Sequence, residues 1–138
     1  RSLQTLPLRL ARHEENALRL ASFLDEHPKI HKLRYPGLPS DPGHKILAGQ
    51  ASGFGSMISC EVASRAEVER ILASVRVFLF AESLGGAASL ITYPLVQTHA
   101  DIDPPILERL GVTDRLLRLS IGLEDPEDLI ADLDAVLG

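Results

Sequence analysis

Apolar residues near the N-terminus follow a helical period. Six of them recur at spacings of three and four residues: Leu3, Leu6, Leu10, Ala17, Leu20 and Leu24. The pattern predicts one long amphipathic helix over about residues 2–27, in which His13 takes one slot of the apolar stripe. Pro28 ends the helix, because the residue before a proline disfavours helical backbone. Pro7 either kinks the helix or marks its true start.

Shorter strands and helices alternate along the rest of the chain. Apolar runs predict five strands, near residues 30–35, 53–62, 77–81, 89–92 and 116–123. Helical spacing predicts four more helices, within residues 38–50, 64–75, 103–112 and 126–137. No repeat or linker divides this order. The predicted fold class is therefore α/β, a single α+β sandwich over 1–138 with helices on one face of a small, mostly antiparallel sheet.

Two of these helices begin with capping signals. Ser64 precedes one of them, and Glu67 would complete a capping box with it. Asp125 is the expected N-cap of the last helix, with Pro126 at its first position. Such signals fix where the helices begin more firmly than periodicity does.

Composition narrows the class of protein. The chain has 138 residues, 45% hydrophobic and 24% charged, which fits one globular domain and excludes disorder. The net charge is −5 and no basic stripe with interleaved aromatics exists, so no nucleic-acid partner is expected. No apolar run is long enough for a membrane partner. The single cysteine, Cys60, fits a reducing, cytoplasmic location. Because the chain opens at Arg1 without methionine, a piece of a longer protein is expected.

Arg118 is the first candidate for a functional residue. It lies in the apolar segment Leu116–Leu123, and a guanidinium that cannot reach water must be paired. In one interpretation it faces solvent or pairs with a structural carboxylate such as Glu82 or Glu124. In the other, its planar fork captures a ligand carboxylate through two hydrogen bonds, which lysine would do less specifically.

A loop of small residues, Glu82–Ser89, is the second candidate. It lacks the ending of a phosphate-binding loop and the dinucleotide fingerprint. It is either a tight turn in which Gly85 or Gly86 supplies a positive φ, or a loop whose hydroxyls and amides line a pocket.

Other polar residues give no specific signal. His27 and His31 straddle Pro28 and cannot share a helical face, so no metal site is expected. Cys60 lies in a predicted strand, where a buried, inert thiol is expected rather than a nucleophile.

Several motifs together resemble one known family. In order along the chain they are "YPGLPSDPGH", "GFGSMIS", "AESLGGAASLI", "THADI" and "LLRLSIGLEDPEDLIADLDAVL". The whole chain resembles the C-terminal domain of the pyridoxal-phosphate (PLP) enzymes of cysteine and methionine metabolism. These include cystathionine γ-synthase, cystathionine γ-lyase, cystathionine β-lyase and methionine γ-lyase. The resemblance implies the small domain of a fold-type I PLP enzyme, begun by the long helix, with the large PLP-binding domain outside this chain.

The resemblance also implies roles for five residues. Arg118 would bind the α-carboxylate of the substrate. Ser83, with Leu84 beside it, would lie near that carboxylate and the link between lysine and cofactor. Glu82 would face the substrate and tune which amino acids are accepted, and Thr98 would support the carboxylate site.

The chain departs from the family pattern in two places. Ala88 replaces an acidic residue that many members carry. The lysine that forms the Schiff base belongs to the large domain, and Lys29, Lys32 and Lys45 all lie outside the resembling motifs. No catalytic residue is therefore assigned to this chain, and PLP is expected to bind the full-length enzyme but not the chain alone.

The expected function is carboxylate anchoring in a trans-sulfuration enzyme that acts on cystathionine or a related sulfur amino acid by β- or γ-elimination or γ-replacement. The full-length enzyme would be a homo-oligomer, usually a homotetramer, and the isolated chain would be inactive. One alternative is a stand-alone amino-acid-binding or regulatory module without catalysis, and another is a scaffold without a ligand. The motifs do not distinguish the reaction subtypes.

Overall fold

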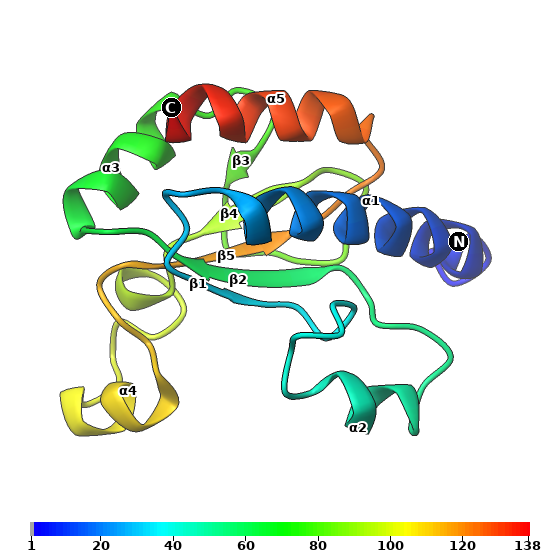
Figure 1. The fold of residues 1–138 in the computed structure, drawn as a ribbon, viewed down its shortest axis with the longest axis horizontal. Helices are drawn as coiled ribbons and strands as arrows, with labels where there is room; N and C mark the ends of the chain where they lie inside the picture. The colour runs from blue at the N-terminus through cyan, green and yellow to red at the C-terminus, as the bar shows by residue number, and fades with distance from the viewer. Residues whose placement is uncertain (1) are drawn as a thin grey trace.

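The computed structural model describes residues 2–138, and a five-stranded sheet runs through its centre (Figure 1). Its strands lie in the order β1 (Lys32–Arg34), β2 (Met57–Glu61), β5 (Leu116–Ser120), β4 (Leu90–Thr92) and β3 (Leu79–Phe80). All neighbours are antiparallel except β3 and β4, which are parallel. The prediction of a mostly antiparallel sheet is confirmed, and the strands are shorter than the apolar runs suggested.

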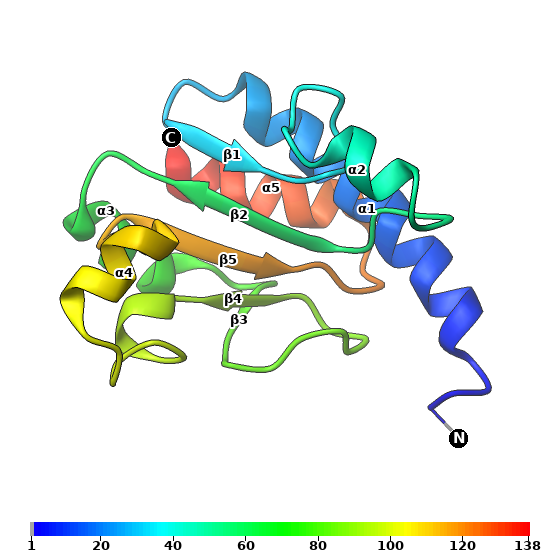
Figure 2. The ribbon, with the colours of Figure 1, turned by 90° about the horizontal axis from the view of Figure 1, so that it is seen from below.

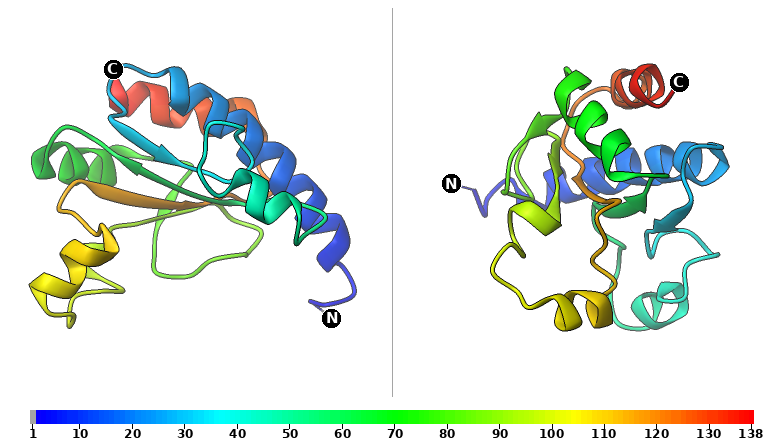
Figure 3. Two further views of the ribbon diagram at one scale, coloured as in Figure 1. Left: turned by 60° about the horizontal axis from the view of Figure 1, so that its bottom comes forward. Right: turned by 90° about the vertical axis from the view of Figure 1, so that its left-hand side faces the viewer.

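Three helices cover one face of this sheet: α1 (Leu6–Glu26), α3 (Arg65–Ser74) and α5 (Pro126–Leu137) (Figures 1 and 3). The shorter helices α2 (His44–Ala48) and α4 (Pro104–Leu110) lie on the other side, and a 3₁₀ turn, η1 (Pro94–Val96), follows β4. The predicted layer of helices on one face is therefore confirmed for the three long helices. Within residues 2–138, no helix has the length and apolar character needed to cross a membrane.

The long first helix begins later than its apolar period predicted. Residues 2–5 form turns, and α1 starts at Leu6 with Pro7 in its first turn. A proline there needs no hydrogen-bonded N–H, so it marks a helix start rather than a kink. The first turns of α1 extend past the edge of the sheet (Figure 2).

The predicted N-caps of α3 and α5 both form, but the capping box of α3 differs from the prediction. Asp125 accepts a hydrogen bond from the Glu127 amide at 2.9 Å. Ser64 accepts from the Glu67 amide at 3.3 Å, but the Glu67 carboxylate accepts from the Ala63 amide instead of the Ser64 amide. The Glu67 side chain therefore binds the amide of the residue before the N-cap, one position earlier than in a standard capping box.

Alternation along the strands builds the core under the helices. Ile58, Cys60, Leu117 and Leu119 point at α1, α3 and α5, and each is nearly inaccessible. Burying one such aliphatic side chain stabilises the fold by about 1.5–3 kcal/mol. Burial also raises the pKa of the Cys60 thiol to about 12, with a smaller contribution from Glu61. The prediction of a buried, inert thiol is confirmed.

Asp132 of α5 organises the connection from α3 to β3. Its carboxylate accepts backbone hydrogen bonds from Arg76, Val77 and Phe78 at 2.8, 2.9 and 3.0 Å.

We expect Asp132→Asn to lower the free energy of unfolding by about 1–3 kcal/mol, because the amide keeps one acceptor oxygen and turns a donor toward an N–H. Urea denaturation measures this. Asp134→Asn, on the exposed side of the same helix, should change stability by less than about 0.5 kcal/mol, and an equal loss in both variants would contradict the prediction.

His13 gives the fold a dependence on pH. Its ring is fully buried, neither nitrogen has a hydrogen-bond partner among residues 2–138, and burial together with the Arg9 charge lowers its pKa below the ordinary value of 6.5. Nearby Glu124 and the Gly86 backbone oppose the shift without cancelling it. The unfolded chain therefore binds a proton below about pH 6.5 that the folded chain resists, so stability is lost as the pH falls through this range.

We expect His13→Leu to remove this loss between about pH 7 and pH 5.5, where most carboxylates remain ionised. Unfolding free energies of the two chains at both pH values test it. The matched change His31→Leu, at an exposed position, should leave the pH dependence as it is. If His13→Leu retains the full loss of stability, another group is responsible.

Candidate functional site

The central strand β5 presents different chemistry on its two faces. Leu117 and Leu119 enter the core, so Arg118 points to the face away from the three long helices. Strand register places Arg118 directly between Ser59 of β2 and Thr92 of β4. The sequence placed an arginine on an apolar strand, and the structure shows that this arginine lies in a row of polar side chains across the middle of the sheet.

The guanidinium of Arg118 has few partners. Its Nη2 donates to the Glu82 carbonyl oxygen at 3.4 Å and to the Thr92 hydroxyl oxygen at 3.5 Å, both long hydrogen bonds. Its Nε is buried and makes no hydrogen bond within the described chain. None of the ion pairs among residues 2–138 includes Arg118.

This arrangement excludes pairing of Arg118 with a structural carboxylate of Glu82 or Glu124, while the Arg118 side chain stays half-buried. Glu82 contacts Arg118 through its backbone rather than through its carboxylate. The Glu124 carboxylate binds the amide and the hydroxyl of Ser89 instead. In the described structure neither acid is a structural counter-ion, so a buried donor of a permanently charged group has no partner. Such a donor costs about 1–3 kcal/mol when it is left unpaired.

Thr92 is a site residue that the sequence did not indicate. Its hydroxyl donates to the Ala81 carbonyl oxygen at 2.8 Å, which leaves its lone pairs to accept from Arg118. Thr92 is almost completely buried. Only the register between β4 and β5 reveals this contact, and neither strand shows its register in the sequence.

The loop after β3 carries three of the predicted site residues. Glu82 reaches Arg118 through its carbonyl, while the side chains of Glu82, Ser83 and Leu84 are exposed. Gly85 follows with a φ of 69°, as the tight-turn interpretation of this loop predicted. The Gly85 amide donates to the Ser120 hydroxyl at 2.9 Å, which holds the loop beside β5. The structure therefore brings this loop and Arg118 together.

Thr98 lies apart from that arrangement. It follows η1, is exposed, and its hydroxyl is within hydrogen-bond distance of His99 Nδ1 at 2.7 Å. No hydrogen bond joins it to Arg118 within residues 2–138; Thr92 makes that contact instead. Its supporting role stays a prediction.

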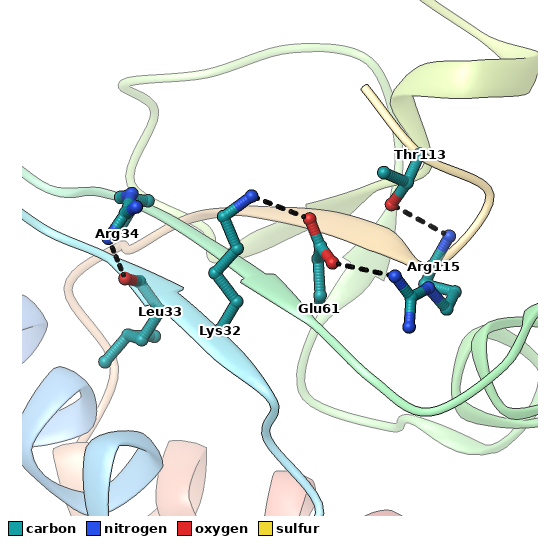
Figure 4. Close-up of polar contacts among 6 residues, drawn as sticks. All are labelled: Lys32, Leu33, Arg34, Glu61, Thr113 and Arg115. Atoms are coloured by element: carbon teal, nitrogen blue, oxygen red, sulfur yellow. Dashed lines mark hydrogen bonds and ion pairs between the residues drawn. The ribbon is translucent and has the colours of Figure 1, made fainter. Parts of the chain in front are cut away.

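A cluster of charges occupies the neighbouring row of the same sheet face (Figure 4). Glu61, only 5% exposed, accepts from Lys32 Nζ at 3.1 Å and from Arg115 Nη2 at 3.4 Å. Lys32 is thus engaged in an ion pair on β1, two strands away from β5. Lys29 follows α1 and Lys45 lies in α2, so no lysine lies on β5 or on either of the strands paired with it.

The arrangement suits an anion better than a metal or a covalently held aldehyde. Arg118 offers a half-buried guanidinium, whereas attachment of PLP would need a lysine at this place. Within the described part of the chain, no group of three or more His, Cys, Asp or Glu residues could hold a metal ion. A guanidinium with so few partners can bind an anion such as a carboxylate.

Comparisons with known proteins identify the family of the chain. The family described as Cys/Met metabolism PLP-dependent enzyme matches residues 1–138. Cystathionine gamma-synthase of Mycobacterium bovis is 50% identical over 139 residues, which cover 100% of this chain and 35% of that protein. Cystathionine beta-lyase of Coxiella burnetii is 46% identical over 138 residues, covering 99% and 36%. The chain therefore spans about a third of the length of these curated relatives.

The fold agrees as well. A crystal structure of cystathionine gamma synthase from Xanthomonas oryzae pv. oryzae, in complex with aminoacrylate and cysteine, superposes with a TM-score of 0.95 at 45% identity. The match covers 98% of this chain and 35% of that one. With a family match over its whole length, the chain belongs to the PLP-dependent enzymes of Cys/Met metabolism.

Proposed function

We propose that this chain anchors the α-carboxylate of the substrate in a PLP-dependent trans-sulfuration enzyme, and that Arg118 is the anchor. The substrate would be cystathionine or a related sulfur amino acid, which the names of the relatives support. The observation that carries the proposal is the guanidinium of Arg118 in the middle of the sheet, which makes two long hydrogen bonds through Nη2 and no ion pair among residues 2–138.

The surroundings of Arg118 favour a carboxylate ligand. Thr92 and the Glu82 carbonyl hold Nη2 from one side, which orients the plane of the fork. Nη1 makes no hydrogen bond within residues 2–138 and, unlike Nε, is not buried, so a carboxylate with two oxygens can take Nη1 together with Nη2. Binding would add charge-assisted bonds to a guanidinium whose present contacts are long. A substrate held in this way keeps a fixed orientation, and a 1 Å error in such orientation can cost about a hundredfold in rate.

The residues of this chain do not fit the covalent attachment of the cofactor. PLP, when bound, supplies an electron sink for chemistry next to the substrate's amino group. None of the three lysines of the chain lies on β5 or on a strand paired with it, so we propose that the lysine comes from outside this chain and that the chain alone has no activity.

The exposed loop would complete the substrate side of the site. Ser83 and Leu84 are proposed to lie near the bound carboxylate, and Glu82 to tune substrate choice. Thr98 is proposed to support the anchor from the segment after η1. Two relatives of similar identity to this chain are named for different reactions, so we propose only carboxylate binding, a step that both reactions would share. The working form is proposed to be a cytoplasmic homotetramer that includes a larger PLP-binding domain.

Replacing Arg118 by lysine in the natural polypeptide that carries these residues tests the proposal. We expect kcat/KM for cystathionine to fall about 10- to 150-fold, because a single ammonium cannot reproduce the charge-assisted, two-nitrogen contact. Absorbance of the bound cofactor should stay at the wild-type level, since Arg118 does not hold it. Steady-state kinetics and the absorption spectrum of the purified protein give both values.

Arg115→Lys is the matched control. Arg115 precedes the same strand, but it pairs with Glu61 in the neighbouring row, so kcat/KM should stay within about twofold. An unchanged kcat/KM in Arg118→Lys would remove the assigned role. Amino-acid binding by the natural polypeptide, measured by calorimetry without turnover, would instead favour a binding module.

A further inference from the structure

The segment between β3 and β4 is exposed along most of its length but firmly held at its end. Ser89 is fully buried, and both of its donors bind the Glu124 carboxylate. The Ser89 amide donates to Oε1 at 2.6 Å and its hydroxyl donates to Oε2 at 2.7 Å. Hydrogen bonds to an ionised acceptor are shorter and stronger than neutral ones, and both distances are in that range.

Further hydrogen bonds join the same two segments in the opposite direction, with donors in the turn after β5. The Ser89 hydroxyl accepts from the Gly122 amide at 2.8 Å, and the Ala87 carbonyl oxygen accepts from the Leu123 amide at 2.8 Å. The backbones approach so closely that a Cβ on Gly122 would overlap the Ala87 carbonyl oxygen. The segment before β4 and the turn after β5 therefore form one bonded unit.

Helix α1 fixes this unit from the other side. Buried Asn16 donates its amide hydrogens to the carbonyl oxygens of Gly122 and Glu124, at 3.1 and 2.8 Å. Arg9, about two turns before Asn16 on α1, donates to the Gly85 carbonyl oxygen at 3.2 Å. The Glu124 carboxylate thus lies in a turn whose own position is fixed by the long helix.

We propose that Glu124 is a positioning residue, which acts on Arg118 through the loop from Glu82 to Ser89. Glu124 holds the C-terminal end of this loop through Ser89, and the N-terminal end supplies the Glu82 carbonyl that orients Arg118 Nη2. The inference rests on the proposed function, because the orientation of Arg118 matters only if Arg118 binds substrate.

The chemistry at Ser89 requires a carboxylate at position 124. Ser89 presents an N–H and an O–H, so it needs two acceptors, and a glutamate has only acceptors. A glutamine would offer one acceptor and an NH₂ group. If the NH₂ group faced the Ser89 hydroxyl, the hydroxyl would accept from it as well as from Gly122, and the hydroxyl proton would have no acceptor. Glu124→Gln keeps the shape of the side chain while it breaks this pattern.

The test uses the natural polypeptide that carries this chain, with bound PLP. We expect Glu124→Gln to raise amide hydrogen exchange about tenfold in peptides that cover residues 82–90, because a charge-assisted bond is lost. The KM for cystathionine should rise about tenfold with kcat within about twofold, since Arg118 is present but less well oriented. Ser89→Ala, which removes the hydroxyl alone, should raise both quantities in the same direction.

Glu127→Gln is the matched control. Glu127 lies three residues further on, is exposed, and among residues 2–138 forms an ion pair only with Arg19 on the surface, so neither loop exchange nor KM should change. If Glu124→Gln changes neither quantity while Arg118→Lys lowers kcat/KM, the positioning role is wrong and the proposed function stands. If loop exchange rises but neither variant affects substrate use, the loop is anchored as described and the proposed function fails. Loss of folding in both Glu124→Gln and Ser89→Ala would show a purely structural role and overturn the proposal.

Discussion

The antiparallel pairing of β5 with strands on both of its sides determines where everything else lies. A central strand has no freedom to slide, because a shift by one residue would bury Arg118 and expose Leu117 and Leu119. The hydrophobic contacts with the helices thus fix the direction of a guanidinium on the opposite face. The stability of the core and the direction of Arg118 depend on the same alternation, so the proposed anchor inherits the rigidity of the core.

The loop beside β5 has exposed side chains over residues 82–88, in contrast to the fixed strand. The side chains of Glu82, Ser83 and Leu84 are exposed, and Leu84 leaves 57% of its surface accessible. Their backbone is nevertheless held by Ser120 at one point and by Glu124 at another. Side chains can therefore differ among relatives with different reactions while the backbone that reaches Arg118 keeps its place.

Sequence reasoning succeeded where the signal is local. The Asp125 cap, the turn at Gly85 and the buried environment of Cys60 each depend on a few neighbouring residues, and the structure confirms them. Arg118 was found because a charge on an apolar strand is unusual by itself. Thr92 was missed because its contact depends on the pairing of strands 26 residues apart, and no short-range pattern records that register.

The same distinction explains why two acids near the site were misjudged as possible partners of Arg118. Proximity in the motif suggested Glu82 and Glu124, but a carboxylate binds whichever donors the fold presents to it. Glu124 meets two donors of Ser89, and Asn16 holds the turn that carries it. An acid satisfied in this way does not compete for the guanidinium, whereas Glu82 is exposed and directs its carbonyl oxygen, not its carboxylate, to Arg118. A site that binds an anion depends on such arrangements, because a free carboxylate in contact with Arg118 would take the place of the ligand.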